Sequence, residues 1–300
     1  MRPGRVDLHT HTTASDGTLS PRELVRTAAE RGVQVLAVTD HDSTDGLAEA
    51  LAEAAARPPL EIVPGLEINC DVAGAEIHVL GYFLDYLAPW FQDFLRSQRA
   101  ERVARIHRIA ARLAELGMPV DPAEVFAIVR EGSPGRPHVA QVMVQRGYVR
   151  SVREAFDKYL HARGPANVAR HRLTPAEAVA VIRQAQGVPV LAHPGLANRD
   201  ELIPDLVGAG LMGLEVYYAE HSPTQTTAYL ELCRRWDLVA TGGSDYHGPQ
   251  SGRTNALGTP TVPWSSWEHL QQRAERARRS RPEPGAGPPR PEPGSRPPCP

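Results

Sequence analysis

The residues best suited to chemistry near the start of the chain are His9, His11 and Asp16. Residues 5–8, just ahead of them, indicate a short strand. Because side chains two apart lie on the same face of a strand, His9 and His11 point in one direction, as two imidazoles bound to one cation must. Asp16 follows in a Ser-Asp-Gly turn that can bring the chain back over that cation. We interpret this stretch as the first half of a metal site.

Histidines and carboxylates recur at the downstream ends of later predicted strands. A single histidine in a strand is more often a hydrogen-bonded residue than a metal ligand, but joint occurrence in one structural context favours metal binding. In a barrel of parallel strands these ends meet at one face, where active sites are built from loops. One candidate, His78, lies within or near the end of its own strand. The candidate ligands are His9, His11, Asp16, His41, Glu67, His78, His193, Asp245 and His247.

The candidate set suits two or three divalent ions, since nine ligands exceed the needs of one. It contains no cysteine, and its nitrogen and oxygen donors favour Mn²⁺ first, with Fe²⁺ or Zn²⁺ as alternatives. Three such ions balanced by Asp16, Glu67 and Asp245 would leave a net charge of about +3, which suits a phosphate dianion and a bridging, metal-bound hydroxide. Clustered metals activate water and stabilise the oxygens of an in-line displacement. We predict phosphoester hydrolysis, with amide hydrolysis left open and the general acid unassigned.

The composition of the 300 residues, 41% hydrophobic and 23% charged, is typical of a soluble globular enzyme. The formal net charge of −2 argues against a generic binder of polyanions. The three scattered cysteines exclude a thiolate zinc cluster and argue against a disulfide framework. The N-terminus lacks the apolar segment of a signal peptide, and no run reaches the ~20 apolar residues of a membrane span. We expect a cytoplasmic enzyme with no membrane association and no obligate protein partner.

Strands and helices alternate in both terminal parts of the sequence, which is typical of a parallel sheet or barrel in an α/β protein. The predicted strands are residues 5–8, 33–38, 60–63, 76–80, 188–192, 213–217 and 238–241. The predicted helices are residues 21–31, 46–57, 174–186, 201–207, 224–236 and 266–278. At the first helix, Ser20 and Glu23 have the spacing of a capping box.

Residues 89–168 interrupt this alternation with helices, predicted at 90–116, 122–129, 137–146 and 151–159. We therefore divide the chain into a barrel formed by residues 1–88 and 169–279 and an all-helical insert at 89–168 for substrate recognition. The last segment, 280–300, is rich in proline, glycine and arginine and is predicted to be disordered.

The insert region is basic, because residues 91–172 contain 15 Arg or Lys and 8 Asp or Glu. An arginine-rich genome explains this surplus as well as a substrate phosphate does. Helical geometry places Arg99 and Arg102 toward the body of the protein. An inward arginine needs an anion, which is either a carboxylate of the fold or a substrate phosphate, and both remain open. The same geometry predicts that three other arginines face solvent: Arg105, Arg108 and Arg112.

Arg136 opens a predicted helix, where free backbone N–H groups favour anions. A guanidinium group suits phosphate because it binds the oxygens through paired hydrogen bonds. Beside the candidate ligands, Asp40, Asp42 and Tyr246 are expected to orient them, with Asp40 supporting His41 instead of binding metal.

These residues resemble the motifs of the PHP superfamily, named for polymerase and histidinol phosphatase. The resemblance covers residues 5–264 and implies a distorted (β/α)₇ barrel, similar to a TIM barrel, with a trinuclear metal centre. The matching motifs are His9-Thr-His11, Thr39-Asp40-His41, Gly65-Leu66-Glu67, Ala192-His193-Pro194 and Ser244-Asp245-Tyr246-His247.

The insert, with Gly135-Arg136-Pro137-His138, resembles the bacterial branch of nucleoside 3′,5′-bisphosphate phosphatases, which includes 5′→3′ exoribonucleases acting on RNA ends. This implies that the metals hold the scissile 3′-phosphate of a nucleotide or short RNA. Hydrolysis of a cyclic phosphate, histidinol phosphate or a sugar phosphate is the alternative within the superfamily. A non-catalytic RNA-binding module with structural metals is a third reading. The residues expected to contact the 5′-phosphate are Arg99, Arg102, Arg136 and His138.

Overall fold

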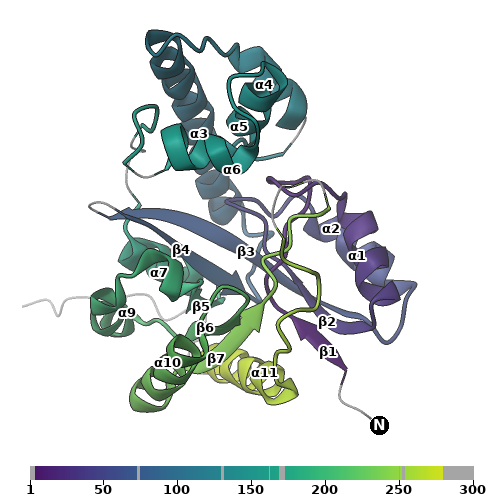
Figure 1. The fold of residues 1–300 in the computed structure, drawn as a ribbon. Helices are drawn as coiled ribbons and strands as arrows, with labels where there is room; N and C mark the ends of the chain where they lie inside the picture. The colour runs from purple at the N-terminus through teal and green to yellow at the C-terminus, as the bar shows by residue number, and fades with distance from the viewer. Residues whose placement is uncertain are drawn as a thin grey trace, which may run out of the picture.

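The computed structural model describes residues 4–72, 75–129, 132–161, 163–168, 173–249, 251 and 254–279. Its seven strands form one sheet in which each strand pairs with the next along the chain. The strands are β1 (Arg5–Asp7), β2 (Val33–Val38), β3 (Glu61–Val72), β4 (Ala75–Tyr82), β5 (Val188–Leu191), β6 (Gly213–Tyr218) and β7 (Val239–Gly243). The N–H of Leu8 donates to the carbonyl of Gly242 over 3.1 Å, which nearly closes the sheet into a barrel (Figure 1). The predicted α/β barrel is confirmed, while the predicted disordered tail lies outside the described residues.

The helices form two groups, one around the barrel and one in the insert. The first group is α1 (Pro21–Glu30), α2 (Leu47–Ala55), α7 (Pro175–Gln184), α8 (Pro194–Ala197), α9 (Ile203–Ala209), α10 (Pro223–Trp236) and α11 (Trp264–Arg279), with a 3₁₀ turn at Asp200–Leu202. The second is α3 (Pro89–Glu115), α4 (Pro122–Val129), α5 (Arg136–Gln145), α6 (Val152–Ala155) and a π-helical turn at Phe156–Leu160. The predicted capping box of α1 is present, because the side chains of Ser20 and Glu23 each accept from the other's backbone N–H.

β4 departs from the predicted parallel arrangement. It pairs antiparallel with both β3 and β5, whereas the other neighbouring strands pair in parallel. The cause is a hairpin, since β3 continues beyond the predicted residues 60–63 and returns directly as β4. β3 pairs with β2 up to Pro64 and with β4 from Gly65 onward, so the proline, which has no N–H to donate, marks the change of partner. Glu67 consequently lies within a strand instead of at its end.

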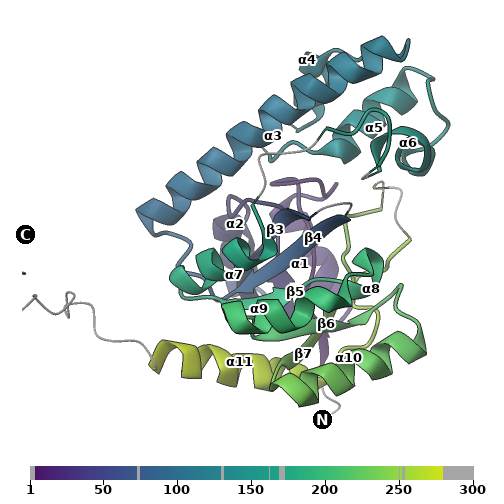
Figure 2. The same ribbon diagram turned by 90° about the vertical axis from the view of Figure 1, so that its left-hand side faces the viewer.

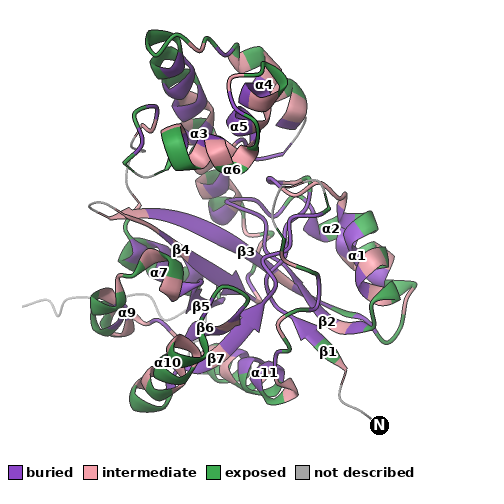
Figure 3. Cartoon of the chain, viewed as in Figure 1, coloured by how far each residue is buried: buried purple, intermediate pink, exposed green. Residues whose placement is uncertain are grey.

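The buried residues of the strands and of the inner helix faces (Figure 3) are mostly apolar and form the core. Inside the barrel the packing uses compact branched side chains such as Val6, Val35 and Val190. Burial of this kind is the main stabilising contribution to the fold, at about 25 cal/mol per Å² of apolar surface. Among the described helices, none combines the length and the apolar character needed to cross a bilayer.

The insert lies over one end of the barrel (Figures 1 and 2). It contacts the loop after β1, where the N–H of Ser133 donates to the carbonyl of Ala14 over 3.0 Å. The 27-residue helix α3 belongs to both parts, because Phe91 packs in the barrel core and Ile109 in a separate apolar cluster of the insert. No strand occurs among the described residues of 89–168. The domain limits taken from the sequence stay a prediction.

The prediction that Arg105 faces solvent is wrong. Its side chain is buried and donates to the carbonyl of Val168 and the side chain of Asn167, over 2.9 and 3.0 Å. The reason is that the segment with Asn167 and Val168 lies against this side of α3, in addition to the apolar contacts that Ile106 and Ile109 make in the insert. Arg108 and Arg112 are exposed, as predicted.

Candidate metal centre

The two histidines after β1 are both fully buried. Thr10, which lies between them, forms an isolated parallel bridge with Tyr246, so the backbone is extended and the rings of His9 and His11 fall on the same side. Their ring centroids are 5.1 Å apart. The end of β7 lies directly behind them, since a Cβ added to Gly243 would be 2.4 Å from the backbone nitrogen of His9. A glycine is therefore required for this close approach.

Glu67 is the carboxylate at the centre of the cluster, and its side chain is buried. Its oxygens face histidines from β4 and from the segments that follow β1, β2 and β5. One strand residue therefore gathers side chains that are far apart in the sequence. The oxygens lie between 2.8 and 3.2 Å from ring nitrogens of His9, His11, His41, His78 and His193.

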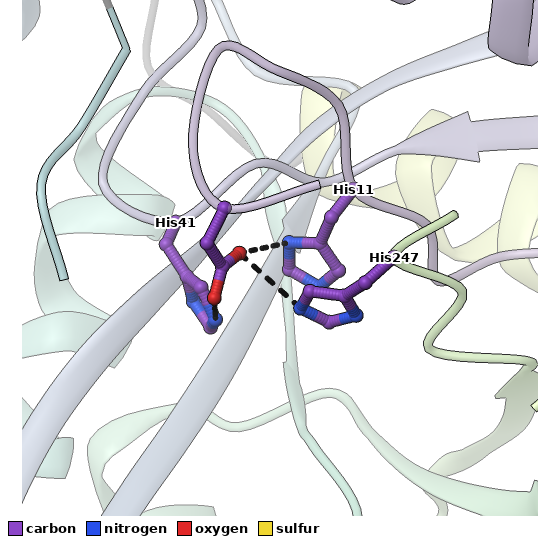
Figure 4. A group of neighbouring side chains, drawn as sticks. His11, His41 and His247 are labelled. Atoms are coloured by element: carbon purple, nitrogen blue, oxygen red, sulfur yellow. Dashed lines mark ion pairs between the residues drawn. The ribbon is translucent and has the colours of Figure 1, made fainter. Parts of the chain in front are cut away.

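Two further carboxylates complete the cluster. Asp16 lies 3.2 Å from a ring nitrogen of His247. It also lies 3.8 Å from His11 and 3.9 Å from His41, and Figure 4 shows these three rings turned toward one another. Asp245 lies 3.2 Å from Nε2 of His11, on the side of that ring that faces Glu67.

The structure thus brings the nine predicted residues to one place, although their roles as ligands stay a prediction. Their donor atoms form three groups, and within each group the atoms lie within 4.8 Å of one another. Glu67 is shared by two groups, and a carboxylate with two oxygens can bind two ions. His193 joins the cluster through Glu67, at 3.1 Å. The groups are His11 with Asp16, His41 and His247; His9 with His11, Glu67 and Asp245; and His41 with Glu67 and His78.

Some nitrogen atoms of the cluster are buried without a hydrogen-bond partner. They include both ring nitrogens of His11 and Nδ1 of His41. These atoms lie near carboxylate oxygens, but without the direction that a hydrogen bond requires. An unsatisfied buried polar atom costs about 1–3 kcal/mol, and a cation bound to the lone-pair nitrogen of each ring would remove that cost at the bound atom. The residues present therefore fit a site for divalent metal ions.

The electrostatics of the cluster show charges that balance one another. Burial would raise the pKa of Asp16, but the rings of His247 and His41 outweigh it and hold the pKa well below its usual range. Burial would lower the pKa of His11, but the adjacent carboxylates of Asp245 and Glu67 outweigh it and raise the pKa to about 9. Protons on some histidines therefore neutralise the carboxylates, and divalent ions would take the place of these protons.

Asp40 supports a different part of the site from the one expected. Its Oδ1 accepts from the N–H of Thr12 over 2.7 Å and from the hydroxyl of Ser15 over 2.6 Å. Asp40 therefore fixes the loop that carries Asp16, instead of supporting His41. Its side chain is buried, so these donors offset the cost of placing a carboxylate in the interior.

Asp42 links the barrel to the insert. Its Oδ2 accepts from Nε of Arg102 over 2.6 Å, and its Oδ1 accepts from the N–H of Asn69 over 3.2 Å. The side-chain amide of Asn69 in turn lies 2.8 Å from Nε2 of His78. A chain of polar contacts therefore runs from α3 to a candidate ligand.

Tyr246 reaches the site through its backbone. Its carbonyl accepts from the N–H of His11 over 2.9 Å. Its side chain packs instead in the apolar cluster that contains Leu36, with the guanidinium group of Arg31 5.8 Å from its ring centroid.

Sequence reasoning missed several buried residues that contact candidate ligands, among them Asn69 beside His78 and two residues of β6. The hydroxyl of Tyr218 donates to Oδ2 of Asp245 over 3.0 Å. A carboxylate oxygen of Glu215 lies 2.9 Å from Nδ1 of His9. Both belong to β6, and a charged residue inside an otherwise apolar strand is the signal that could have identified Glu215.

The four residues predicted to contact phosphate line two hollows beside the cluster. Arg102 and Arg136 line a cavity of about 90 Å³ that adjoins the histidines. Arg99 and His138 line a larger hollow of about 960 Å³ that reaches Asp16. Their contacts with substrate stay a prediction.

Three of these side chains have partners within the fold that bear on their roles. Arg136 pairs with Glu76, donates to the carbonyl of Leu160 over 2.9 Å, and lies over the ring of Phe156. Arg99 is partly exposed and lies 3.3 Å from a carboxylate oxygen of Asp45. Nδ1 of His138 accepts from the N–H of Gly135 over 3.0 Å, which leaves the ring proton on Nε2. Burial lowers the pKa of His138, which favours the neutral ring.

Known proteins resemble this chain over nearly all of its length. Residues 7–121 match the family model of the PHP domain. The chain is 36% identical over 283 residues to the 5′-3′ exoribonuclease Rnm of Escherichia coli (strain K12), an alignment covering 90% of this chain and 96% of that protein. It is 34% identical over 281 residues to the 3′,5′-nucleoside bisphosphate phosphatase of Chromobacterium violaceum, covering 90% of this chain and 98% of that protein.

A solved structure agrees with these sequence matches. It is the crystal structure of a Bifidobacterium adolescentis protein provisionally named a metal-dependent phosphoesterase, which is 32% identical. The two structures align with a TM-score of 0.82, covering 90% of this chain and 97% of that chain. Fold, site and sequence thus lead to one conclusion: the chain belongs to the PHP family.

Proposed function

We propose that the chain is a metal-dependent phosphoesterase that removes the 3′-phosphate from nucleoside 3′,5′-bisphosphates and also acts as a 5′→3′ exoribonuclease on short RNA. The observation that carries this proposal is the buried meeting of histidine and carboxylate side chains, in which ring nitrogens of His11 and His41 lack hydrogen-bond partners. The exoribonuclease and the phosphatase among the relatives support the substrate class.

We assign the nine clustered residues as ligands of three divalent ions, with Mn²⁺ as the first choice and Fe²⁺ or Zn²⁺ as alternatives. Bound there, the ions would supply Lewis acidity that activates water and stabilises charge on the attacking and leaving oxygens. The protein's own contribution is to hold the ligands in place. Glu67 faces five histidines, and Asp40 fixes the loop that carries Asp16.

One site can serve both substrates because the same bond breaks in each. In the bisphosphate and at the 5′ end of RNA, water attacks the phosphorus on the 3′ oxygen of a nucleotide that carries a 5′-phosphate. The P–O3′ bond breaks, and the 3′ oxygen leaves as a hydroxyl after taking up a proton. Recognition of the 5′-phosphate therefore positions the scissile bond in both cases.

We assign Arg136, assisted by Arg102, to recognition of the 5′-phosphate. Both line the cavity of about 90 Å³ next to the cluster. Arg136 pairs directly with Glu76, which also lines this cavity, so a dianionic phosphate would compete with that carboxylate for the guanidinium group. In the larger hollow, Nε2–H of His138 can donate a hydrogen bond to a substrate oxygen, while Arg99 lies at the rim.

A substrate panel on the Mn²⁺-loaded full chain tests the reaction. We expect a nucleoside 3′,5′-bisphosphate and a 5′-phosphorylated RNA oligomer to be turned over faster than histidinol phosphate or a cyclic phosphate. The double variant His9→Ala, His11→Ala should be inactive. Retained activity in that variant, or none in metal-replete wild type, would favour a binding module with structural metals.

Arg136→Ala tests the assignment of the phosphate contact. Hydrogen bonds to a charged group contribute about 1.5–3 kcal/mol, so kcat/KM for the bisphosphate should fall about 10- to 150-fold. The rate with p-nitrophenyl phosphate, which has no second phosphate, should change less than about threefold. The matched control is Arg146→Ala at the other end of α5, where the arginine forms an exposed pair with Glu124. Equal losses with both substrates would remove Arg136 from this role.

We further propose that the enzyme acts in the cytoplasm, on a phosphorylated small molecule or RNA end, without a membrane or an obligate protein partner. The described cysteines, Cys70 and Cys233, are both free thiols, as is usual in a reducing compartment.

A further inference from the structure

Glu215 lies on β6 next to the histidine cluster, and its side chain has no exposed surface. Its Oε1 lies 2.9 Å from Nδ1 of His9, and its Oε2 accepts from the backbone N–H of His193 over 2.8 Å. His9 follows β1, and His193 follows β5. One buried carboxylate thus connects candidate ligands from opposite parts of the barrel.

The contact with Glu215 determines which nitrogen of His9 is available to a cation. An ionised carboxylate only accepts hydrogen bonds, so the proton of the neutral ring must be on Nδ1. The lone pair is then on Nε2, which faces the cluster at 3.1 Å from Glu67 and 3.4 Å from Asp245. This is the arrangement in which an outer carboxylate orients a metal-binding histidine.

The contact with the backbone of His193 holds an unusual conformation. His193 has a φ of +26°, in the left-handed region that a residue with a side chain seldom adopts. The hydrogen bond from its N–H to Glu215 anchors the chain at this point. The imidazole of His193 is thereby directed at Glu67, with its Nε2 3.1 Å from Oε1 of that carboxylate.

We propose that Glu215 is a positioning residue of the metal centre, which sets the tautomer of His9 and the backbone of His193 so that both rings face the ions. A carboxylate is required because two N–H donors converge on it. A glutamine would offer one acceptor and one NH₂ group, and the NH₂ group would face one of these donors. This inference rests on the proposed function to the extent that the cluster binds divalent ions.

Mn²⁺ binding tests the proposal without reference to catalysis. Metal-free full-length protein would be titrated with Mn²⁺ by isothermal titration calorimetry. Loss of an outer partner of a metal ligand typically weakens metal binding about 10- to 100-fold, and we expect a loss in this range for Glu215→Gln. The matched control is Val216→Ala, on the same strand with its side chain in the apolar cluster on the other face. That variant should unfold at a lower temperature but bind Mn²⁺ within about twofold of wild type.

An NMR measurement on wild type keeps the proposal testable if Glu215→Gln does not fold. In ¹⁵N-histidine-labelled, Zn²⁺-loaded protein, the ring of His9, assigned by its absence in His9→Ala, should carry its proton on Nδ1. A proton on Nε2 would overturn the proposal, as would unchanged Mn²⁺ affinity in folded Glu215→Gln. Normal Mn²⁺ binding by wild type without any phosphatase activity would instead refute the proposed reaction and leave the role of Glu215 standing.

Discussion

Replacing Arg102 with methionine is expected to destabilise the protein, because this arginine is part of the junction between barrel and insert. Its side chain is 8% exposed and that of its partner Asp42 is fully buried. The guanidinium group also donates to the carbonyl of Pro134 over 3.2 Å and to the side chain of Asn69. Arg102→Met would remove the guanidinium charge that lies 2.6 Å from the buried Asp42 carboxylate.

The size of the effect follows from this burial. Removing one partner of a buried ion pair costs about 3–5 kcal/mol, mostly because the remaining charge is uncompensated. With an m value of about 3 kcal/mol/M in urea, the unfolding midpoint would fall by about 1–1.7 M. Adding Asp42→Asn to Arg102→Met should restore part of the stability, since both charges of this pair are then removed.

Urea unfolding followed by circular dichroism would measure the loss, and KM for the bisphosphate would be determined in parallel. The control is Arg108→Met on the same helix, whose pair with Glu101 is exposed and 3.9 Å long. Exposed ion pairs contribute about 0–1 kcal/mol to stability, so the urea midpoint of this variant should be close to that of wild type. If Arg102→Met lowers the free energy of unfolding by less than about 1 kcal/mol and also raises KM strongly, the structural role is refuted. Arg102 would then be assigned to substrate binding alone.

Three further predictions concern the metal centre and the core. Tyr218→Phe removes the donor to Asp245 and should weaken Mn²⁺ binding about 10- to 100-fold without loss of helix signal; unchanged affinity would show that this hydroxyl is dispensable. Although burial lowers the pKa of His11, the nearby carboxylates raise it to about 9, so Mn²⁺ must displace protons at pH 7 and bind more tightly as pH rises toward 9. Calorimetry in buffers of different ionisation enthalpy would count these protons, and a count of zero would contradict the assignment. Burial raises the pKa of Cys233 to about 12, and Cys70 is also buried, so peptide mapping should find neither labelled by a thiol reagent at pH 8 in folded protein.

Much of the barrel and nearly all of the cluster could be predicted because their signals are local. Capping boxes at Ser20 and Thr174 mark the starts of α1 and α7, where free N–H groups need acceptors. The rings of His9 and His11 could be predicted to converge, because residues two apart in a strand lie on the same face. The direction of β4 could not be predicted, since an apolar strand pattern is the same for parallel and antiparallel pairing.

Contacts between residues distant in sequence account for what was missed. Glu215 and His9 are separated by 206 positions, and Arg102 and Asp42 by 60, so spacing says nothing of either pair. The helical periodicity correctly predicted that Arg102 points inward. It could not predict whether the partner of this arginine is a carboxylate of the fold or a substrate phosphate. The structure shows that this partner is the carboxylate of Asp42. The same periodicity gave the wrong prediction for Arg105, because the method assumes that only one face of the helix is buried.

The position of Arg102 on α3 explains how the insert is held relative to the site. The first part of the helix packs in the barrel core through Phe91 and Leu95, and the later part packs in the insert through Ile106 and Ile109. Arg102 lies between these two apolar contacts, at the level of the loop that follows β2. A continuous helix of 27 residues is about 40 Å long and resists bending, so packing at one end fixes the other. The apolar contacts thus set the distance between insert and barrel, and the directional bonds of Arg102 set the register in which the insert faces the metal ligands.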